Sequence, residues 1–111
     1  MVEPGFVRGK HFTKYVETVK TVKRRGDFPA LETLLLELVD ATEAESRAEG
    51  WGVAPWYYEE LANLYKKQDQ PQKELAILER YDGQKKAPGA LPPKLAERLA
   101  KLRKRLGEGG A

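Results

Sequence analysis

The sequence has no cysteine and almost no histidine or serine. Its 111 residues include no Cys, one His (His11), one Ser (Ser46) and one Asn (Asn63). The absence of Cys excludes disulfide bonds, thiolate metal sites and cysteine nucleophiles. A single His and a single Ser leave little material for a hydrolytic triad or a histidine-ligated metal. We therefore expect no enzymatic activity, no cofactor and no bound metal.

Long hydrophobic runs are also absent. The longest run, residues 34–36, consists of three leucines, whereas a membrane-spanning helix needs roughly 18 apolar residues. Residues 1–9 contain Glu3 and Arg8 and no continuous apolar stretch, so they do not resemble a secretory signal. We treat them as an N-terminal arm and expect a cytoplasmic protein that does not bind membranes. The many Glu, Lys, Leu and Arg residues, with little Asn, are typical of thermophilic proteins.

Charge is distributed unevenly along the chain, although the formal net charge is only +3. Residues 1–26 have a balance of +5, residues 27–60 of −8 and residues 61–111 of +6. A dedicated nucleic-acid-binding module is usually basic along its whole contact face. The three blocks of charge indicate one of two arrangements. Either the segments of the chain attract one another, or the protein presents two faces of opposite charge to a partner.

Apolar residues recur at helical spacing in five segments, and no segment alternates as a strand would. This pattern predicts an all-α domain over residues 10–106, followed by a flexible tail at 107–111. The first helix is expected to end at Gly26, and the second to begin at Asp27 and run to about Arg47. The other three helices are expected to begin at prolines, at positions 55, 71 and 92.

An internal repeat relates the first two predicted helices to the next two. A shift of 42 positions aligns seven identical residues between positions 15 and 39 and their counterparts. The matches include the aromatic pair Tyr15 and Tyr57 and an Asp-x-Pro turn in each copy. We interpret the match as a true repeat of a helical hairpin.

Two helical hairpins followed by a lone amphipathic helix resemble the tetratricopeptide repeat family. In the first repeat, at about residues 10–47, the family's core positions are occupied by Tyr15, Val19, Val22, Leu31, Leu35 and Leu38. In the second, at about residues 54–83, they are occupied by Tyr58, Leu61, Ala62 and Tyr65. The capping helix, at about residues 92–106, carries Leu95, Leu99, Leu102 and Leu106. The resemblance implies a fragment of an α-solenoid.

The sequence departs from this family in three respects. It has only two repeats, whereas about three are usually needed for a stable stack. The shift of 42 exceeds the family period of about 34 residues, and we place the extra residues in segment 41–54. Glu74 stands where the family prefers alanine.

The resemblance also implies a groove on the inner face of the first and third helices, where the family holds a peptide or a partner's helix. The groove positions carried over to this chain are Thr13, Val16, Lys20, Lys23 and Arg24, with Trp56, Glu59, Asn63, Lys66 and Lys67. The candidate partner-binding residues among them are Lys20, Lys23, Arg24, Trp56, Asn63, Lys66 and Lys67. Their cations suit an acidic or C-terminal segment. Alternatively, they only solvate the helix ends and interact with the helix dipoles.

Segment 51–58 contains four aromatic residues, and Trp and Tyr are enriched at binding hot spots. We expect Trp51 to fold back as a buried plug over the first helix pair, because large aromatic side chains are mostly buried. Trp56 and Tyr57 are then the candidates for an exposed aromatic patch.

The predicted fifth helix is strongly basic. Its cations include Lys94, Arg98, Lys101 and Arg105, at the same spacing as its leucines. Such a helix suits phosphate groups, but acidic residues between positions 37 and 49 also offer counter-charges within the molecule. The acidic residues lack the spacing of a calcium-binding loop.

The function that these patterns favour is that of a non-enzymatic adaptor that binds a peptide or helix of a partner protein. Two alternatives remain open. One is a nucleic-acid-binding accessory module that uses the first and fifth helices. The other is a structural homodimer in which the acidic middle of one copy meets the basic ends of the other.

Overall fold

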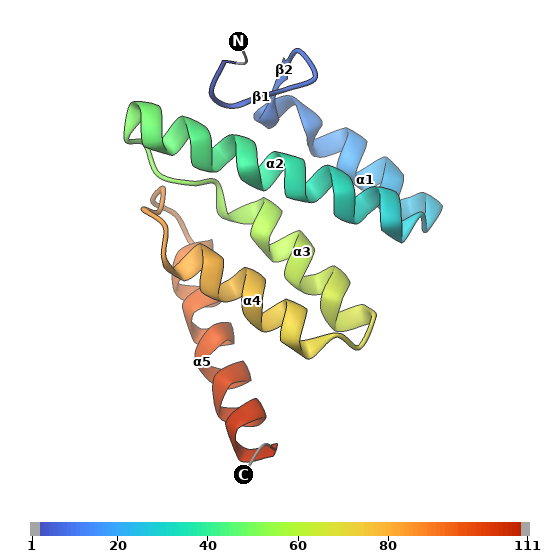
Figure 1. Ribbon diagram of the computed structural model, residues 1–111, viewed down its shortest axis with the longest axis vertical. Coiled ribbons are helices and arrows are strands. Elements are labelled where there is room, and N and C mark those ends of the chain that lie inside the picture. The colour runs from blue at the N-terminus through green and yellow to red at the C-terminus, as the bar shows by residue number, and fades with distance from the viewer. Residues whose placement is uncertain (1–2, 110–111) are drawn as a thin grey trace.

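The chain is mostly helical, as Figure 1 shows for a computed structural model in which residues 3–109 are described. A two-stranded antiparallel sheet, β1 (Phe6–Val7) and β2 (Lys10–His11), comes first and leads into a short 3-10 helix, η1 (Phe12–Tyr15). The α-helices that follow are α1 (Val16–Arg25), α2 (Phe28–Glu49), α3 (Pro55–Lys67), α4 (Pro71–Asp82) and α5 (Leu91–Gly109).

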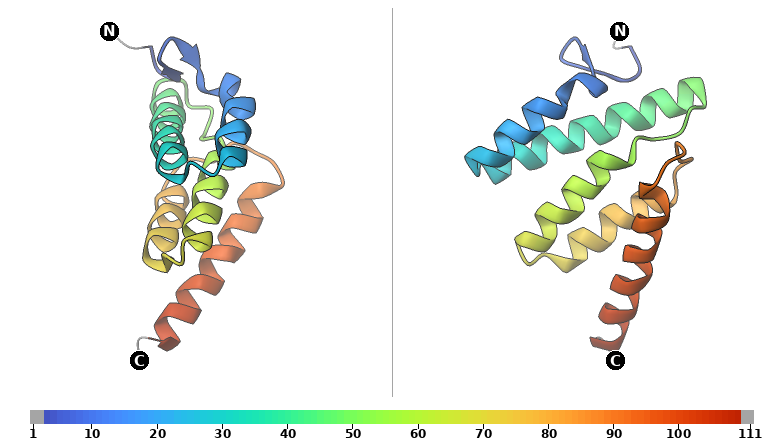
Figure 2. Two further views of the ribbon diagram at one scale, coloured as in Figure 1. Left: turned by 90° about the vertical axis from the view of Figure 1, so that its right-hand side faces the viewer. Right: turned by 180° about the vertical axis from the view of Figure 1, so that it is seen from behind.

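The helices form two layers. The left view of Figure 2 shows α2 and α4 in one layer and α1 and α3 in the other, with α5 running obliquely from the α3 side to below α3 and α4. Each helix packs against the next one in the chain, and α3 also contacts α5. The apolar stripes predicted from the sequence meet between the layers, where Val19, Leu35, Leu61, Leu78 and Leu99 are all buried.

Local sequence explains where the helices begin and end. The Asp27 carboxylate accepts a hydrogen bond from the Ala30 N–H, 3.2 Å away, and caps α2 as predicted. Gly26 has a φ of +73°, a left-handed conformation that favours glycine, and it ends α1. Prolines in the first turn begin α3 and α4, where their missing N–H groups cost little.

Two expectations about elements need correction, one about strands and one about the end of α5. The expectation that no segment forms a strand is wrong, because residues 6–7 pair with residues 10–11. Gly9 has a φ of +86° at the connecting turn, a signal for a tight turn that helical periodicity cannot reveal. α2 ends at Glu49, within two residues of the expected end near Arg47. α5 continues past Gly107 to Gly109, into the expected tail. The rest of the expected tail, residues 110–111, lies outside the described residues.

The loop between α2 and α3 does not form the buried plug that the sequence suggested. Trp51 is 65% exposed, and Val53 is the residue of this loop that enters the core, with no exposed surface. The Val53 N–H donates to the carbonyl of Lys85, 2.8 Å away, and the Ala87 N–H donates to the carbonyl of Val53, 3.3 Å away. These bonds join the loop to the α4–α5 connection and direct Trp51 outward.

Buried carboxylates connect the helices of the two layers. Glu43 of α2 is buried and accepts hydrogen bonds from Arg80 Nε of α4 at 2.8 Å and from the Tyr58 hydroxyl of α3 at 2.7 Å. Burial by itself raises the pKa of the Glu43 carboxyl, but the bonds from Arg80 and Tyr58 outweigh it and hold that pKa below its ordinary value. The ionised form of Glu43 therefore stabilises the fold.

Acid should remove this stabilisation in a predictable way. Because the folded-state pKa of Glu43 is lowered, its contribution is complete above the ordinary carboxyl pKa of 4.5 and is lost as pH falls through the folded-state value. At neutral pH we expect Glu43→Gln to lower the free energy of unfolding by about 2 kcal/mol. Urea unfolding followed by circular dichroism should show that this difference shrinks in acid. The exposed Glu17→Gln is the control, and a Glu43→Gln effect independent of pH would contradict the assignment.

Candidate functional site

An apolar cavity of about 300 Å³ opens between the η1–α1 segment and the start of α3. Its lining residues are Phe12, Thr13, Val16, Lys20, Ala54, Trp56 and Tyr57. The Phe12 and Tyr57 rings meet edge to face at 5.8 Å between centroids, and Trp56 meets Tyr57 in the same way at 5.3 Å. The cavity therefore has aromatic walls. Its one cationic lining residue is Lys20, whose Nζ atom lies 3.8 Å from Glu17 Oε1.

Tyr57 is fixed in the wall of this cavity and is not part of an exposed patch. Its side chain is buried, and its hydroxyl donates to the carbonyl of Phe12 at 2.6 Å. Burial raises the pKa of Tyr57 to about 12. The expectation of an exposed Tyr57 is thus wrong, whereas Trp56 is partly exposed beside it.

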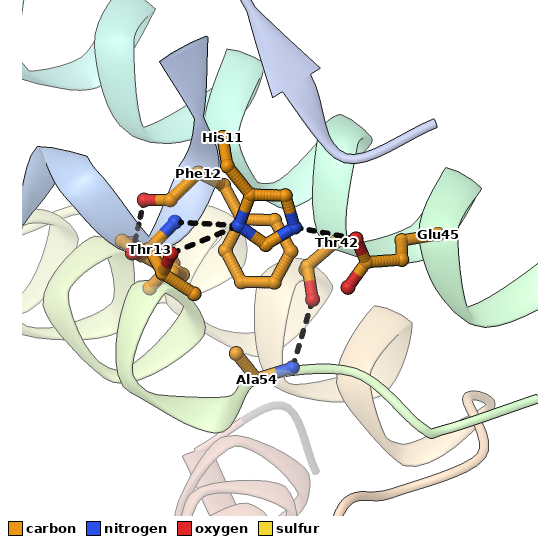
Figure 3. A network of polar contacts seen from close by, with 7 residues as sticks. His11, Phe12, Thr13, Thr42, Glu45 and Ala54 are labelled. Carbon is orange, nitrogen blue, oxygen red and sulfur yellow. Dashed lines mark hydrogen bonds and ion pairs between the residues drawn. The ribbon is translucent and has the colours of Figure 1, made fainter. Parts of the chain in front are cut away.

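Both walls of the cavity are attached to α2 by polar contacts (Figure 3). The His11 ring lies between Thr13 and Glu45, with its Nδ1 atom 2.9 Å from Thr13 Oγ1 and its Nε2 atom in contact with the Glu45 carboxylate. On the other wall, the Ala54 N–H donates to the Thr42 hydroxyl at 2.9 Å. These contacts hold the start of η1 and the start of α3 at a fixed separation.

A basic groove of about 490 Å³ lies between α3, α4 and α5. It is lined by Lys66, Glu74, Lys94, Glu97, Arg98, Lys101, Leu102 and Arg105. Glu74 and Glu97 are both engaged, with Arg98 at 2.8 Å and Lys101 at 2.9 Å. Lys66 and Lys94 form no ion pair with the described residues, so the groove offers cations to an anionic ligand.

The structure separates the candidate partner-binding residues into three groups. Lys20 and Trp56 line the apolar cavity, and Lys66 lines the basic groove. Asn63 accepts a hydrogen bond from Arg98 at 2.7 Å, at the edge between α3 and α5.

The remaining candidates have contacts within the molecule. Lys23 Nζ lies 3.0 Å from the buried carboxylate of Glu60. Arg24 donates to the Thr21 hydroxyl at 3.2 Å, and Lys67 Nζ lies 5.0 Å from the centre of the Phe28 ring. Lys23 is thus a structural residue, because it neutralises a carboxylate that is almost removed from water.

Phe12 and the cations of α5 contribute to these sites, although the candidate set did not include them. The spacing of the α5 cations was visible in the sequence, but their position opposite Lys66 depends on the direction in which α5 packs. Glu74, the departure from the tetratricopeptide pattern, is buried and accepts two hydrogen bonds from Arg98, at 2.8 and 3.0 Å. An acidic residue at this position thereby orients α5 along the groove.

Several acidic residues of α2 have partners within this chain. Arg80 binds both Asp40, at 2.7 Å, and Glu43, while Glu45 contacts His11. Within residues 3–109 no group of three or more His, Cys, Asp or Glu side chains is placed to hold a metal ion. None of the helices described is long and apolar enough to cross a membrane.

Comparison with known proteins adds no relative to this picture. No protein-family model, no curated protein and no solved structure matches the chain. The candidate site is therefore argued from the geometry of this chain alone.

The contact between His11 and Glu45 should determine how firmly the N-terminal hairpin is held. Glu45→Ala removes it, and we expect amide hydrogen exchange to become faster in residues 6–15 and to stay unchanged in α4 and α5. Mass spectrometry of deuterated peptides measures both regions in one experiment. Glu49→Ala, at an exposed position near the end of α2, is the control. Equal exchange in the two variants would contradict this role of Glu45.

Proposed function

We propose that the chain is a protein-interaction adaptor of the tetratricopeptide type, which binds a segment of a partner protein across the face formed by α1, α3 and α5. The two-layer packing of consecutive helices supports this assignment, as does the repeated Asp-x-Pro turn that begins α2 and α4. The proposal makes α1 with α2 and α3 with α4 the two repeats, and α5 the capping helix.

The proposal depends on one observation: the cavity and the groove lie on neighbouring helices of the face formed by α1, α3 and α5. The cavity uses α1 and α3, and the groove uses α3 and α5. A segment that crosses α3 can thus insert one large apolar side chain beside Trp56 and place carboxylates near Lys66 and Lys94. Charge-assisted hydrogen bonds from these lysines would fix the direction of the segment.

A peptide suits this face better than a nucleic acid does. The groove has cations for phosphate, but Leu102 is the apolar residue of its lining and no aromatic ring is available there for base stacking. In addition, Glu74 and Glu97 line the groove and oppose a continuous row of phosphates. We therefore favour an acidic peptide with an apolar anchor.

The test uses a panel of labelled peptides that each contain one large apolar side chain and several acidic residues. A matched panel has lysine in place of the acidic residues. Lys20→Glu combined with Lys66→Glu should weaken binding of the acidic peptides at least tenfold, because about 1.4 kcal/mol corresponds to a factor of ten. Fluorescence anisotropy measures the affinities.

The control for this test is Lys104→Glu, an exposed position of α5 outside the groove lining. Lys23 is left unchanged, since Lys23→Glu would place a second carboxylate beside buried Glu60 and disturb the fold. The proposal fails if no acidic peptide binds more tightly than its lysine counterpart, or if the double variant binds as the wild type does.

A further inference from the structure

Five cations form a row at the ends of three helices. Arg24 and Arg25 end α1, Lys66 and Lys67 end α3, and Arg105 lies near the end of α5. All five side chains are exposed. The ion pairs that α1, α3 and α5 form within the described residues use other side chains. We call these five residues the basic edge.

Two contacts show that the basic edge is continuous. Lys67 Nζ lies 5.0 Å from the centre of the Phe28 ring, which brings the end of α3 against the turn between α1 and α2. Lys66 and Arg105 line one pocket of about 390 Å³ at the start of α4, so the end of α5 adjoins the end of α3. Figure 1 shows the α1–α2 and α3–α4 turns along one side of the molecule and the end of α5 below them.

The two cation pairs stand at equivalent positions of the two helical hairpins. The alignment by 42 positions matches Arg24 with Lys66 and Arg25 with Lys67. Each pair forms the last turn of the first helix in its hairpin, next to the turn that leads into the second helix. Positive charge therefore recurs along the same side of the molecule.

Two carboxylates adjoin the basic edge, and they do not neutralise it. Asp27 and Asp69 stand at equivalent positions, two residues after each cation pair. The Asp27 carboxylate caps α2 through the Ala30 N–H. Five cations against these two carboxylates leave an excess of three positive charges. The helix dipoles of the hairpins add little, because each turn joins the negative end of one helix to the positive end of the next.

Other charges nearby cancel. Glu74 lines the pocket at the start of α4, but its carboxylate accepts two hydrogen bonds from Arg98. Lys104 and Glu108, which stand before and after Arg105 in the sequence, have opposite charges. The excess of three positive charges therefore remains when these residues are counted.

The chemistry of the basic edge suits a chain of phosphates. Exposed cations without a carboxylate partner can each replace a counterion on a nucleic acid. Among the described residues Trp51 is the exposed large hydrophobic side chain, and it follows the other end of α2; Phe28, at this edge, is only partly exposed. Unpaired bases would thus have no ring to stack on, and a membrane would receive no apolar side chain. A duplex, which offers its backbone, needs neither.

We propose that the basic edge binds the phosphate backbone of a nucleic-acid duplex without reading its sequence. This activity goes beyond the proposed adaptor function and does not depend on it, because Arg24 and Arg25 line neither the cavity nor the groove. Lys66 and Arg105 belong to both the edge and the groove. An adaptor with such an edge brings its partner protein to DNA or RNA.

Backbone contacts of this kind have a characteristic dependence on salt. Each neutralised phosphate contributes about 0.9 to the slope of log affinity against log salt, so contacts from all five cations give a slope of about −4.5. A fourfold rise in salt then weakens binding about 500-fold.

Fluorescence anisotropy with a labelled DNA duplex of about 20 base pairs, titrated between about 25 and about 100 mM salt, measures this slope. Arg24→Gln combined with Arg25→Gln should weaken binding and reduce the slope by about 1.8, because two phosphate contacts are lost. Lys10→Gln combined with Lys14→Gln is the matched control, which removes the same charge from exposed positions before α1 and should leave the slope unchanged. All four side chains are exposed, so circular dichroism should show an unchanged fold.

Further probes identify the ligand. An RNA duplex of the same sequence shows which nucleic acid is preferred, and salt-dependent binding of either duplex supports the proposal. Failure of both duplexes to bind at low salt overturns it, and so do equal slopes for the two double variants. Tighter binding of a single strand, of polyglutamate or of vesicles that contain phosphatidylserine also overturns it, because each result assigns the edge to another class of ligand.

These outcomes are distinct from those of the peptide test. The variant that lacks Arg24 and Arg25 should bind acidic peptides as the wild type does. Failure of every acidic peptide to bind would remove the adaptor function and leave duplex binding intact. A wild type that binds acidic peptides but no duplex would do the reverse.

Discussion

The contact between Arg80 and Glu43 is the interaction on which the arrangement of the helices depends. Arg80 of α4 binds both oxygens of the Glu43 carboxylate on α2, and Tyr58 of α3 donates to the same carboxylate. One buried group thereby joins three helices from both layers. A buried carboxylate is costly without partners, so this contact restricts how α4 can pack relative to α2. Apolar packing alone would tolerate small shifts along the helices.

Two further buried carboxylates form ion pairs between helices, and these pairs position the candidate site. Glu60 of α3 binds Lys23 of α1, and Glu74 of α4 binds Arg98 of α5. The first contact links the two helices that form the apolar cavity, and the second directs α5 along α3, where it completes the basic groove. The binding face of the proposed adaptor is thus a consequence of ion pairs that lie beneath it.

Local signals in the sequence predicted the helices well and the polar contacts poorly. Asp27, Gly26 and the helix-opening prolines act within one turn of their own positions, so their effects can be read from neighbouring residues. The burial of Glu43, Glu60 and Glu74 cannot be read from neighbouring residues, because each carboxylate depends on a cation more than twenty residues away in the chain. Trp51 misled in the opposite direction, since its exposure is set by backbone bonds to a distant loop. The cavity was anticipated through Lys20 and Trp56, but the α5 side of the groove required the direction of that helix.

A double-mutant cycle on Glu43 and Arg80 tests most directly whether this contact fixes the helices. The free energy of unfolding is measured in urea for the wild type, Glu43→Gln, Arg80→Met and the combined variant. Glu79 and Arg103 provide the matched surface cycle. Their side chains are each about half exposed, and a guanidinium nitrogen of Arg103 lies 3.2 Å from Glu79 Oε2. The account predicts a coupling energy of about 2–3 kcal/mol for the buried pair, and below about 1 kcal/mol for the surface pair. Additive effects at Glu43 and Arg80, with a coupling no larger than that of the surface pair, would contradict it.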